Sequence, residues 1–142
     1  MTVPARSPSR STARRRAIEI LYEAEIRRRS RLTTLQERRA AADPPVPEYT
    51  VRLVEGVEEH AERIDELLRA HSRGWTLERM APVDRNVLRL GVYELLYEPD
   101  VPDVVAVSEA VKLARELSGE DAPAFVNGVL GRLLELKPTL QP

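Results

Sequence analysis

Cysteine is absent from the sequence, and so are long apolar runs. Without cysteine the chain has no disulfide framework, no thiolate nucleophile and no cysteine–zinc site, a composition that suits a reducing cytosol. The N-terminal stretch, MTVPARSPSR, is charged and contains prolines, and no apolar segment long enough for a signal peptide follows it. No later run approaches the roughly 20 apolar residues of a membrane span. The sequence therefore predicts a soluble, cytoplasmic protein that does not enter a membrane.

Motifs of catalysis and of metal binding are also missing. His60 and His71 lie eleven positions apart, without a His-Glu-x-x-His motif, a cysteine partner or a nucleophile elbow nearby. No dinucleotide-binding or P-loop fingerprint occurs. We expect both histidines to be packing or surface residues. The sequence therefore predicts a protein that is not an enzyme and that holds neither a metal nor a cofactor.

What the chain does contain is charge, distributed unevenly. The net charge is -1, but residues 1–39 hold eleven of the 22 basic residues and four of the 23 acidic ones, so this segment carries +7 and the remainder -8. A basic arm on an acidic body is common where the arm binds a polyanion, although solvated arginines are the simpler alternative. The 142 residues suit a single domain. We place it at residues 11–136, between a flexible basic arm at 1–10 and a C-terminal tail at 137–142.

The segment from Ser11 to Arg29, STARRRAIEILYEAEIRRR, has the periodicity of an amphipathic helix. Ser11 or Thr12 is the expected N-cap. At about 100° per residue, one face collects the apolar side chains and the opposite face the charged ones, with Tyr22 at the boundary. The helix can therefore bury one face and present guanidinium groups on the other. The predicted inner face consists of Ala13, Ala17, Ile20, Leu21 and Ala24.

Helical spacing of apolar residues continues along the rest of the chain. The further expected N-caps are Thr33, which begins a capping box, then Asp84 and Asp121. One long core helix is expected between residues 47 and 74, where apolar side chains recur at steps of three and four. No segment has the alternation of a strand or an Asn-Gly hairpin turn, so the sequence predicts an all-α fold. The seven expected helices, the fourth of them short, lie at 11–29, 33–42, 47–74, 74–82, 84–98, 101–118 and 121–136.

Three segments carry a resemblance to a known family. They are ARRRAIEILYEAE; then GWTLERMAPVDRNVLRLGVYELLY, with its VDR-x-x-LR motif at residues 83–89; and finally a stretch containing FVNGVL at 125–130, with Asp121 four residues before Phe125. Together they resemble the NusB family of bacterial transcription antitermination factors over residues 13–134. The resemblance implies a fold of two small helical bundles packed across each other.

The resemblance also implies an RNA ligand. Members of the family bind boxA, a short single-stranded element in the leader of ribosomal RNA transcripts. The resemblance assigns phosphate contacts to the clustered Arg14, Arg15 and Arg16, because guanidinium forks pair with phosphate oxygens. Phosphate contacts position an RNA and base contacts specify it. The ring of Phe125 is therefore the candidate for base stacking, and the carboxylate of Asp121 is the candidate acceptor for base amino groups.

Residue type alone allows other roles for these side chains. Phe125 lies in an apolar stretch and has the character of a core residue, and Asp121 is an ordinary helix cap. Tyr22, also assigned to the RNA site, would normally be a half-buried packing residue with a solvated hydroxyl. Gly128 and Gly131 are expected to permit close helix approach, because no glycine-rich phosphate loop surrounds them.

A protein partner is a further implication of the resemblance. Family members form a heterodimer with the small-subunit ribosomal protein NusE and act indirectly in the antitermination complex of RNA polymerase. A basic ribosomal protein suits the acidic body, and Asp84 is the candidate contact, although a capping role explains this residue more simply. A homodimer that buries the arginine-rich helix stays open. So do two other interpretations: a helical adaptor without RNA affinity, and a fragment of an RNA cytosine methyltransferase with a NusB-like domain.

Overall fold

The computed structural model describes residues 9–140, which are helical apart from the connecting loops and contain no strand. This part of the chain confirms the all-α prediction. Two short 3-10 turns, η1 (Leu77–Arg79) and η2 (Lys137–Thr139), accompany seven α-helices. The helices are α1 (Arg10–Arg27), α2 (Arg31–Ala41), α3 (Glu48–Glu59), α4 (Ala61–His71), α5 (Pro82–Tyr97), α6 (Asp103–Leu117) and α7 (Ala122–Leu136).

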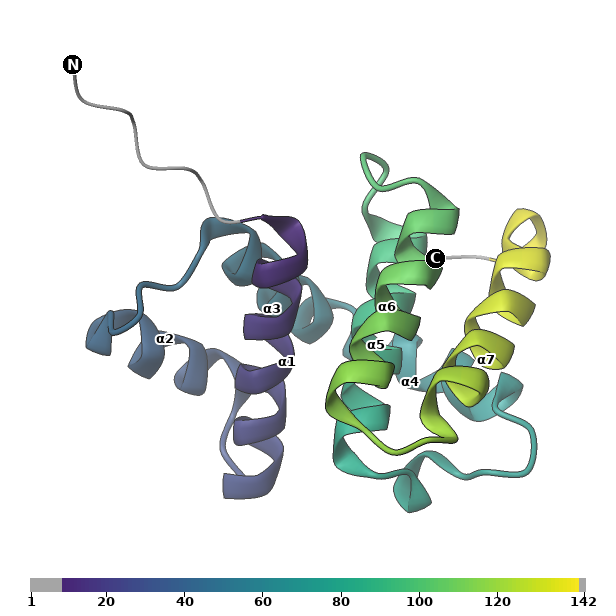
Figure 1. The fold of residues 1–142 in the computed structure, drawn as a ribbon, viewed down its shortest axis with the longest axis horizontal. Coiled ribbons are helices and arrows are strands. Elements are labelled where there is room, and N and C mark those ends of the chain that lie inside the picture. The colour runs from purple at the N-terminus through teal and green to yellow at the C-terminus, as the bar shows by residue number, and fades with distance from the viewer. Residues whose placement is uncertain (1–8, 141–142) are drawn as a thin grey trace.

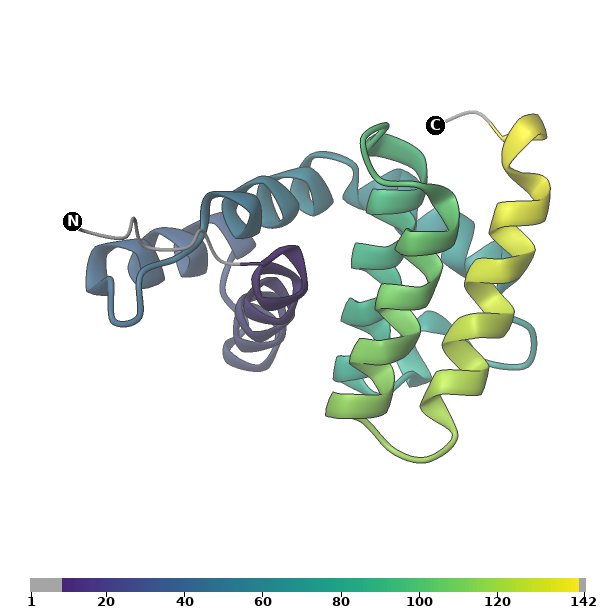
Figure 2. The same cartoon turned by 45° about the horizontal axis from the view of Figure 1, so that its top comes forward.

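The helices form two small bundles (Figures 1 and 2). In both views α1, α2 and α3 lie together on one side, and α5, α6 and α7 stand side by side on the other, with α4 behind them. α1 and α3 also pack against α5, which therefore joins the two bundles. One continuous hydrophobic cluster extends through both bundles. The two-bundle fold implied by the family resemblance is confirmed.

α1 buries the face that its periodicity predicts. All five expected inner residues are buried, together with Ile18. The predicted caps Ser11 and Thr12 are wrong, because the side chain of Ser9 accepts a hydrogen bond from the backbone N–H of Thr12, at 3.1 Å. The helix therefore begins at Arg10. The predicted N-terminal arm lies outside the described residues, except for its last two positions, which belong to this helix start.

Two further predicted caps lie inside their helices. Thr33 is the third residue of α2, and its N–H donates to the side chain of Ser30, at 3.0 Å, so Ser30 is the N-cap. Asp84 is the third residue of α5, which begins at Pro82 after the N-cap Ala81. Proline favours the first helical position, since its fixed φ suits the helix and it has no N–H to leave unpaired.

The long helix predicted between residues 47 and 74 is wrong in one respect. The chain leaves the helical conformation at His60, where φ is -106° and ψ is 17°, and this residue separates α3 from α4. The ring of His60 stacks on Tyr97, with the two centroids 3.7 Å apart. Apolar steps of three and four run straight through the break, so the pattern does not reveal it. The break turns α4 so that it contacts α5 and α7.

Close helix approach occurs at Gly56 of α3. A Cβ placed there would lie 2.1 Å from Cε1 of Tyr93 on α5. The Tyr93 ring cannot swing aside freely, because its hydroxyl donates to Glu98 at 2.7 Å. Two residues expected at such approaches, Gly128 and Gly131, instead face open space, since a Cβ at either would meet no atom within 4 Å among the described residues. That expectation is wrong.

Gly56→Ala is expected to lower the free energy of unfolding by about 2 kcal/mol, because the added methyl group overpacks the α3–α5 contact. Gly128→Ala is the matched control: it also replaces a helical glycine, but in open space. The control should be neutral or raise the unfolding free energy by up to about 1 kcal/mol through helix propensity. Urea denaturation of both variants measures the difference, and equal effects of the two changes would contradict the packing described here.

Candidate nucleic-acid interface

The three clustered arginines of α1 differ in their surroundings. Arg14, which the sequence places with two exposed neighbours, is only 3% exposed, so its expected position at the surface is wrong. Its Nε donates to Oε1 of Glu94 on α5 at 2.7 Å, and its Nη1 lies 3.7 Å from Oε2 of Glu109 on α6. Burial opposes the charge of Arg14, but the hydrogen bond and the charge of Glu94 outweigh burial and raise its pKa. Arg14 therefore joins α1 to the second bundle.

Tyr49 completes the environment of that buried pair. Its hydroxyl donates to the other oxygen of Glu94, and burial followed by this hydrogen bond raises the pKa of Tyr49. The guanidinium of Arg10 lies over the Tyr49 ring, 4.4 Å from its centroid. Both carboxylate oxygens of Glu94 are thus hydrogen-bonded, which is the condition for a buried charge to be tolerated.

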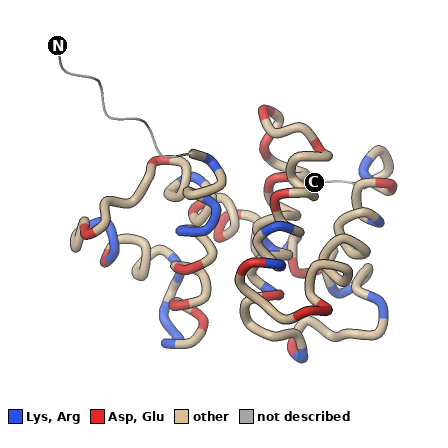
Figure 3. The backbone as a smooth tube through the Cα atoms, in the orientation of Figure 1, with Lys and Arg blue, Asp and Glu red and all other residues tan. Residues whose placement is uncertain are grey.

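Arg15, Arg16 and Tyr22 lie nearer the surface of α1. The Arg15 side chain is 43% exposed and pairs with Glu116 of α6, while Arg16 pairs with Glu19 at 3.3 Å. Tyr22 is exposed and stands two turns from Arg15 on the same helix face. Figure 3 shows basic residues toward both ends of α1 with acidic residues between them. Exposed ion pairs contribute about 0–1 kcal/mol, so the guanidinium of Arg15 can exchange a carboxylate for another anion, whereas the Arg16 side chain is only 18% exposed.

Phe125 and Asp121 lie together at the start of α7. The Phe125 ring is half-buried and meets the ring of Trp75 edge-on, with the centroids 6.5 Å apart and the planes at 67°. Trp75 itself is 56% exposed, although the sequence gave no reason to assign it to the site. Asp121 is at the N-cap position as predicted, but its side chain makes no capping hydrogen bond within the described chain. Its exposed carboxylate is therefore open to a ligand.

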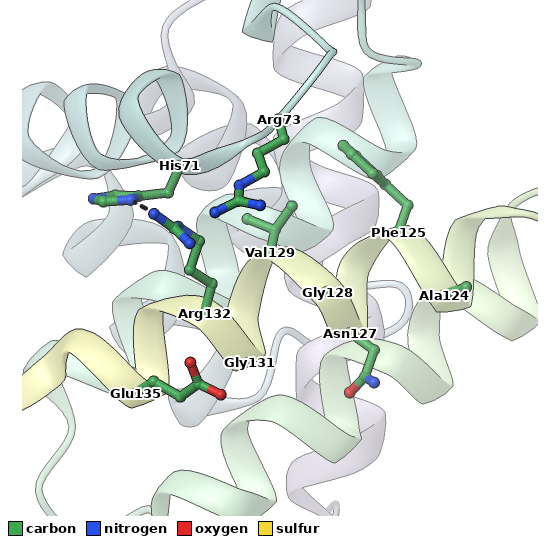
Figure 4. Close-up of a pocket in the computed structure, with 10 residues that line it drawn as sticks. All are labelled: His71, Arg73, Ala124, Phe125, Asn127, Gly128, Val129, Gly131, Arg132 and Glu135. Carbon is green, nitrogen blue, oxygen red and sulfur yellow. Dashed lines mark hydrogen bonds between the residues drawn. The ribbon is translucent and has the colours of Figure 1, made fainter.

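Three hollows adjoin α7. One, of about 520 Å³, lies between the end of α4 and α7 and includes Arg73 and Arg132 (Figure 4). The second, of about 430 Å³, has both Trp75 and Phe125 in its wall and also Arg79. The third, of about 720 Å³, lies between the end of α6 and α7. Phe125 thus separates two hollows, and its ring is accessible between them.

Unpaired arginines gather at these hollows. Most described arginines have a carboxylate within 4.0 Å, but six do not, as far as residues 9–140 are concerned. Four of the six line the hollows around α7, whereas only one lies near the start of α1. A cation without a carboxylate partner is available to a polyanion. The six are Arg10, Arg28, Arg73, Arg79, Arg115 and Arg132.

Asp84 lies at the edge of the same surface. It lines the second hollow together with Asp121, and its carboxylate accepts a hydrogen bond from the hydroxyl of Ser118 at the end of α6. Asp84 therefore does not cap α5. Its carboxylate instead links α5 to the loop between α6 and α7.

The VDR-x-x-LR motif supports this surface from within the fold. Arg85 donates to Glu25 on α1 at 2.6 Å, and to the carbonyl oxygens of Leu77 and Met80 at 2.8 and 3.0 Å. Arg89 donates to Asp65 on α4 at 2.9 Å. The motif therefore anchors the loop that carries Trp75 and Arg79 to α5 and to the first bundle.

Glu25→Gln is expected to lower the free energy of unfolding by about 2 kcal/mol at pH 7, somewhat less than for a fully buried ion pair. Burial alone would raise the pKa of Glu25, but the hydrogen bonds and charges of Arg85 and Arg89 lower it below its ordinary 4.5. A carboxylate with a lowered folded-state pKa contributes stability above 4.5 that is lost as pH falls through the folded value. The difference between wild type and variant should therefore shrink as pH falls below 4.5. A difference in denaturation midpoint that is independent of pH would contradict this role.

The described residues contain no cluster of three or more potential metal ligands. None of their helices combines the length and the apolar character needed to cross a membrane. A two-bundle helical fold with aromatic rings and unpaired arginines on one surface defines the class of small helical nucleic-acid-binding proteins. Within that class the chain belongs to the NusB family, whose family model matches residues 11–135.

Named relatives are similar over nearly the whole chain. The transcription antitermination protein NusB of Thermobifida fusca is 55% identical over 135 residues, which are 95% of each chain. The same protein from Arthrobacter sp. is 54% identical over 93% of this chain and 97% of its own. Among solved structures, T. maritima NusB is 34% identical with a TM-score of 0.82, over 92% of this chain and 93% of its own. A structure of NusB and NusE in complex with dsRNA is 29% identical with a TM-score of 0.78, over 89% of this chain and 96% of its own.

Proposed function

We propose that this protein acts in the cytoplasm as a transcription antitermination factor that binds the boxA element of ribosomal RNA leaders together with NusE. The observation that carries the RNA part is the set of unpaired arginines around the accessible ring of Phe125. The names of the relatives support the transcriptional role. The solved complex of NusB and NusE with dsRNA supports both an RNA and a protein partner.

Each residue type has a distinct task in this proposal. Phe125, with Trp75 edge-on beside it, is a platform on which an unstacked base can lie, worth about 1–3 kcal/mol per base. Asp121 accepts hydrogen bonds from base amino groups and so contributes to sequence choice. Arg15 and Arg16 bind phosphates from α1, and Tyr22 extends their face of the helix. Arg14 affects RNA binding only indirectly, because it fixes the start of α1 against α5.

The protein partner is proposed for the surface near Asp84. A basic ribosomal protein is electrostatically suited to residues 40–142, which carry -8. Charge reversal in Asp84→Lys should then weaken the heterodimer. Because Asp84 lines the same hollow as Phe125 and Asp121, RNA binding by the isolated variant is measured beside it. The names of the relatives favour the antitermination role over the methyltransferase-fragment alternative, because both relatives are named as antitermination proteins.

A single mobility-shift gel distinguishes this proposal from the adaptor alternative. Mobility-shift titration at low salt should give a complex with a boxA oligonucleotide at lower protein concentration than with a scrambled RNA of equal length. Added NusE should tighten the boxA complex, and by linkage the RNA tightens the heterodimer by the same factor. An adaptor without RNA affinity would shift neither RNA.

A further inference from the structure

The hollow between α4 and α7 contains residues that are not required to stack a single base on Phe125. We call it the α4–α7 groove and define it by the ten residues drawn in Figure 4. It borders Phe125 at one end and continues along α7 for three helical turns, as far as Glu135. Its volume of about 520 Å³ is within the usual range of small-ligand sites.

Two guanidinium groups reach into the α4–α7 groove from different elements. Arg73 descends from the loop after α4, and Arg132 rises from α7 toward α4 (Figure 4). Neither has a carboxylate within 4.0 Å among residues 9–140. One acidic residue, Glu135, lines the groove at the end away from Phe125. The groove therefore has a net positive charge near the proposed stacking platform.

His71 holds Arg132 in place. Nδ1 of the imidazole accepts a hydrogen bond from Nε of Arg132, at 3.4 Å, which requires a neutral ring. Burial, then the charges of Arg132 and Arg63, lower the pKa of His71 and favour that neutral form. The outer nitrogens of Arg132 stay free to donate, and together with Arg73 they can bind a phosphate from two sides.

The floor of the α4–α7 groove is open helix backbone. Gly128 and Gly131 lie one turn apart on α7 with Ala124 before them, and a Cβ at either glycine would meet none of the described atoms within 4 Å. Apart from the chain neighbours of each glycine, no described side chain therefore lies within 4 Å of these two positions. The amide of Asn127 stands at the rim, where it offers both a donor and an acceptor.

We propose that the α4–α7 groove binds a second nucleotide of the single-stranded RNA, next to the one stacked on Phe125, with its phosphate between Arg73 and Arg132. This inference rests on the proposed function, because the groove continues from the Phe125 platform. The glycine floor leaves room for the ribose and base, and Asn127 can hydrogen-bond a base edge. The groove extends the RNA site beyond the base that Phe125 holds.

The test uses the full chain and RNAs that grow by single nucleotides at either end of a minimal boxA oligonucleotide. Wild type should gain affinity on extension at one end. The double variant Arg73→Gln, Arg132→Gln should lose that gain, about tenfold for charge-assisted hydrogen bonds to one phosphate. The slope of log affinity against log salt should fall by roughly 0.7 for the lost phosphate contact.

Gly128→Met provides a second variant that leaves every arginine in place. Its side chain would fill the groove, and the Cβ meets no neighbouring atom, so the fold is expected to persist. It should abolish the same gain. Arg28→Asn is the matched control, because Arg28 is also unpaired within the described chain but lies at the far end of α1, in a left-handed conformation that asparagine tolerates.

Two results would overturn the groove proposal: a double variant that keeps the full gain, or a gain reduced as strongly by Arg28→Asn. Failure of the proposed function has a different signature, since wild type would then bind boxA and scrambled RNA equally. An acidic protein is the alternative ligand for the groove. A peptide of Asp and Glu residues tests it by competition. If this peptide displaced the extended RNA but not the minimal one, the groove would be assigned to a protein instead.

Discussion

Phe125→Ala is expected to weaken binding of a boxA RNA by about tenfold to a hundredfold, the loss that corresponds to one stacked base. Binding of a scrambled RNA should fall much less, because the phosphate contacts of the arginines do not depend on the ring. The ring is half-buried and borders two hollows, so it can serve a ligand and still touch the core. Fluorescence anisotropy with both RNAs measures the two affinities.

Phe125→Tyr is the conservative control and should keep most of the preference for boxA, because the aromatic face is retained. Thermal unfolding of each variant accompanies the binding measurements. If Phe125→Ala weakened both RNAs equally and also lowered the melting temperature by several degrees, the ring would be a packing residue only. The stacking role would then have to be abandoned.

Arg14→Ala is expected to lower the free energy of unfolding by about 3–5 kcal/mol, because it leaves the carboxylate of Glu94 buried without its cation. Glu94 is fully buried, and its remaining partner is the hydroxyl of Tyr49. Urea denaturation at pH 7 measures the loss. Arg15→Ala, one position further along α1, should change the unfolding free energy by less than about 1 kcal/mol, as for other exposed ion pairs.

The two arginine variants also separate RNA contact from fold. Arg15→Ala should reduce the salt slope of RNA binding by roughly 0.7 while the protein stays folded. A folded Arg14→Ala protein with wild-type stability and a reduced salt slope would mean that Arg14 is a phosphate contact like its neighbour. Its burial against Glu94 would then be irrelevant to function.

Local patterns predicted much of the fold. The inner face of α1 and the all-α class follow from periodicity, which depends only on neighbours along the chain. Arg14 could not be placed in this way, because its partner Glu94 lies 80 residues further on. The break at His60 is hidden for a similar reason: the apolar steps continue through it, and the ring that stacks on His60 comes from α5.

The site was predicted less completely than the fold. Phe125 and Asp121 were found through the family motif, and the structure places both at the accessible start of α7. Trp75 and Arg132 were not singled out, because nothing in the sequence indicates which aromatic residue lies beside Phe125 or which arginines lack a carboxylate. Those properties arise only when α4, α6 and α7 come together. Gly128 was wrongly expected at a contact between helices, because the sequence does not show which side chains lie beside it after the helices pack.

Trp75 provides the most direct measurement of where the RNA binds. It is the single tryptophan of the chain, it is 56% exposed, and its ring meets Phe125 edge-on. Titration of the protein with boxA RNA should change the tryptophan fluorescence, saturate at one RNA per chain and give the dissociation constant found by mobility shift. RNA that binds with the same constant and leaves the fluorescence of Trp75 unchanged would place the interface away from the start of α7 and contradict the assignment.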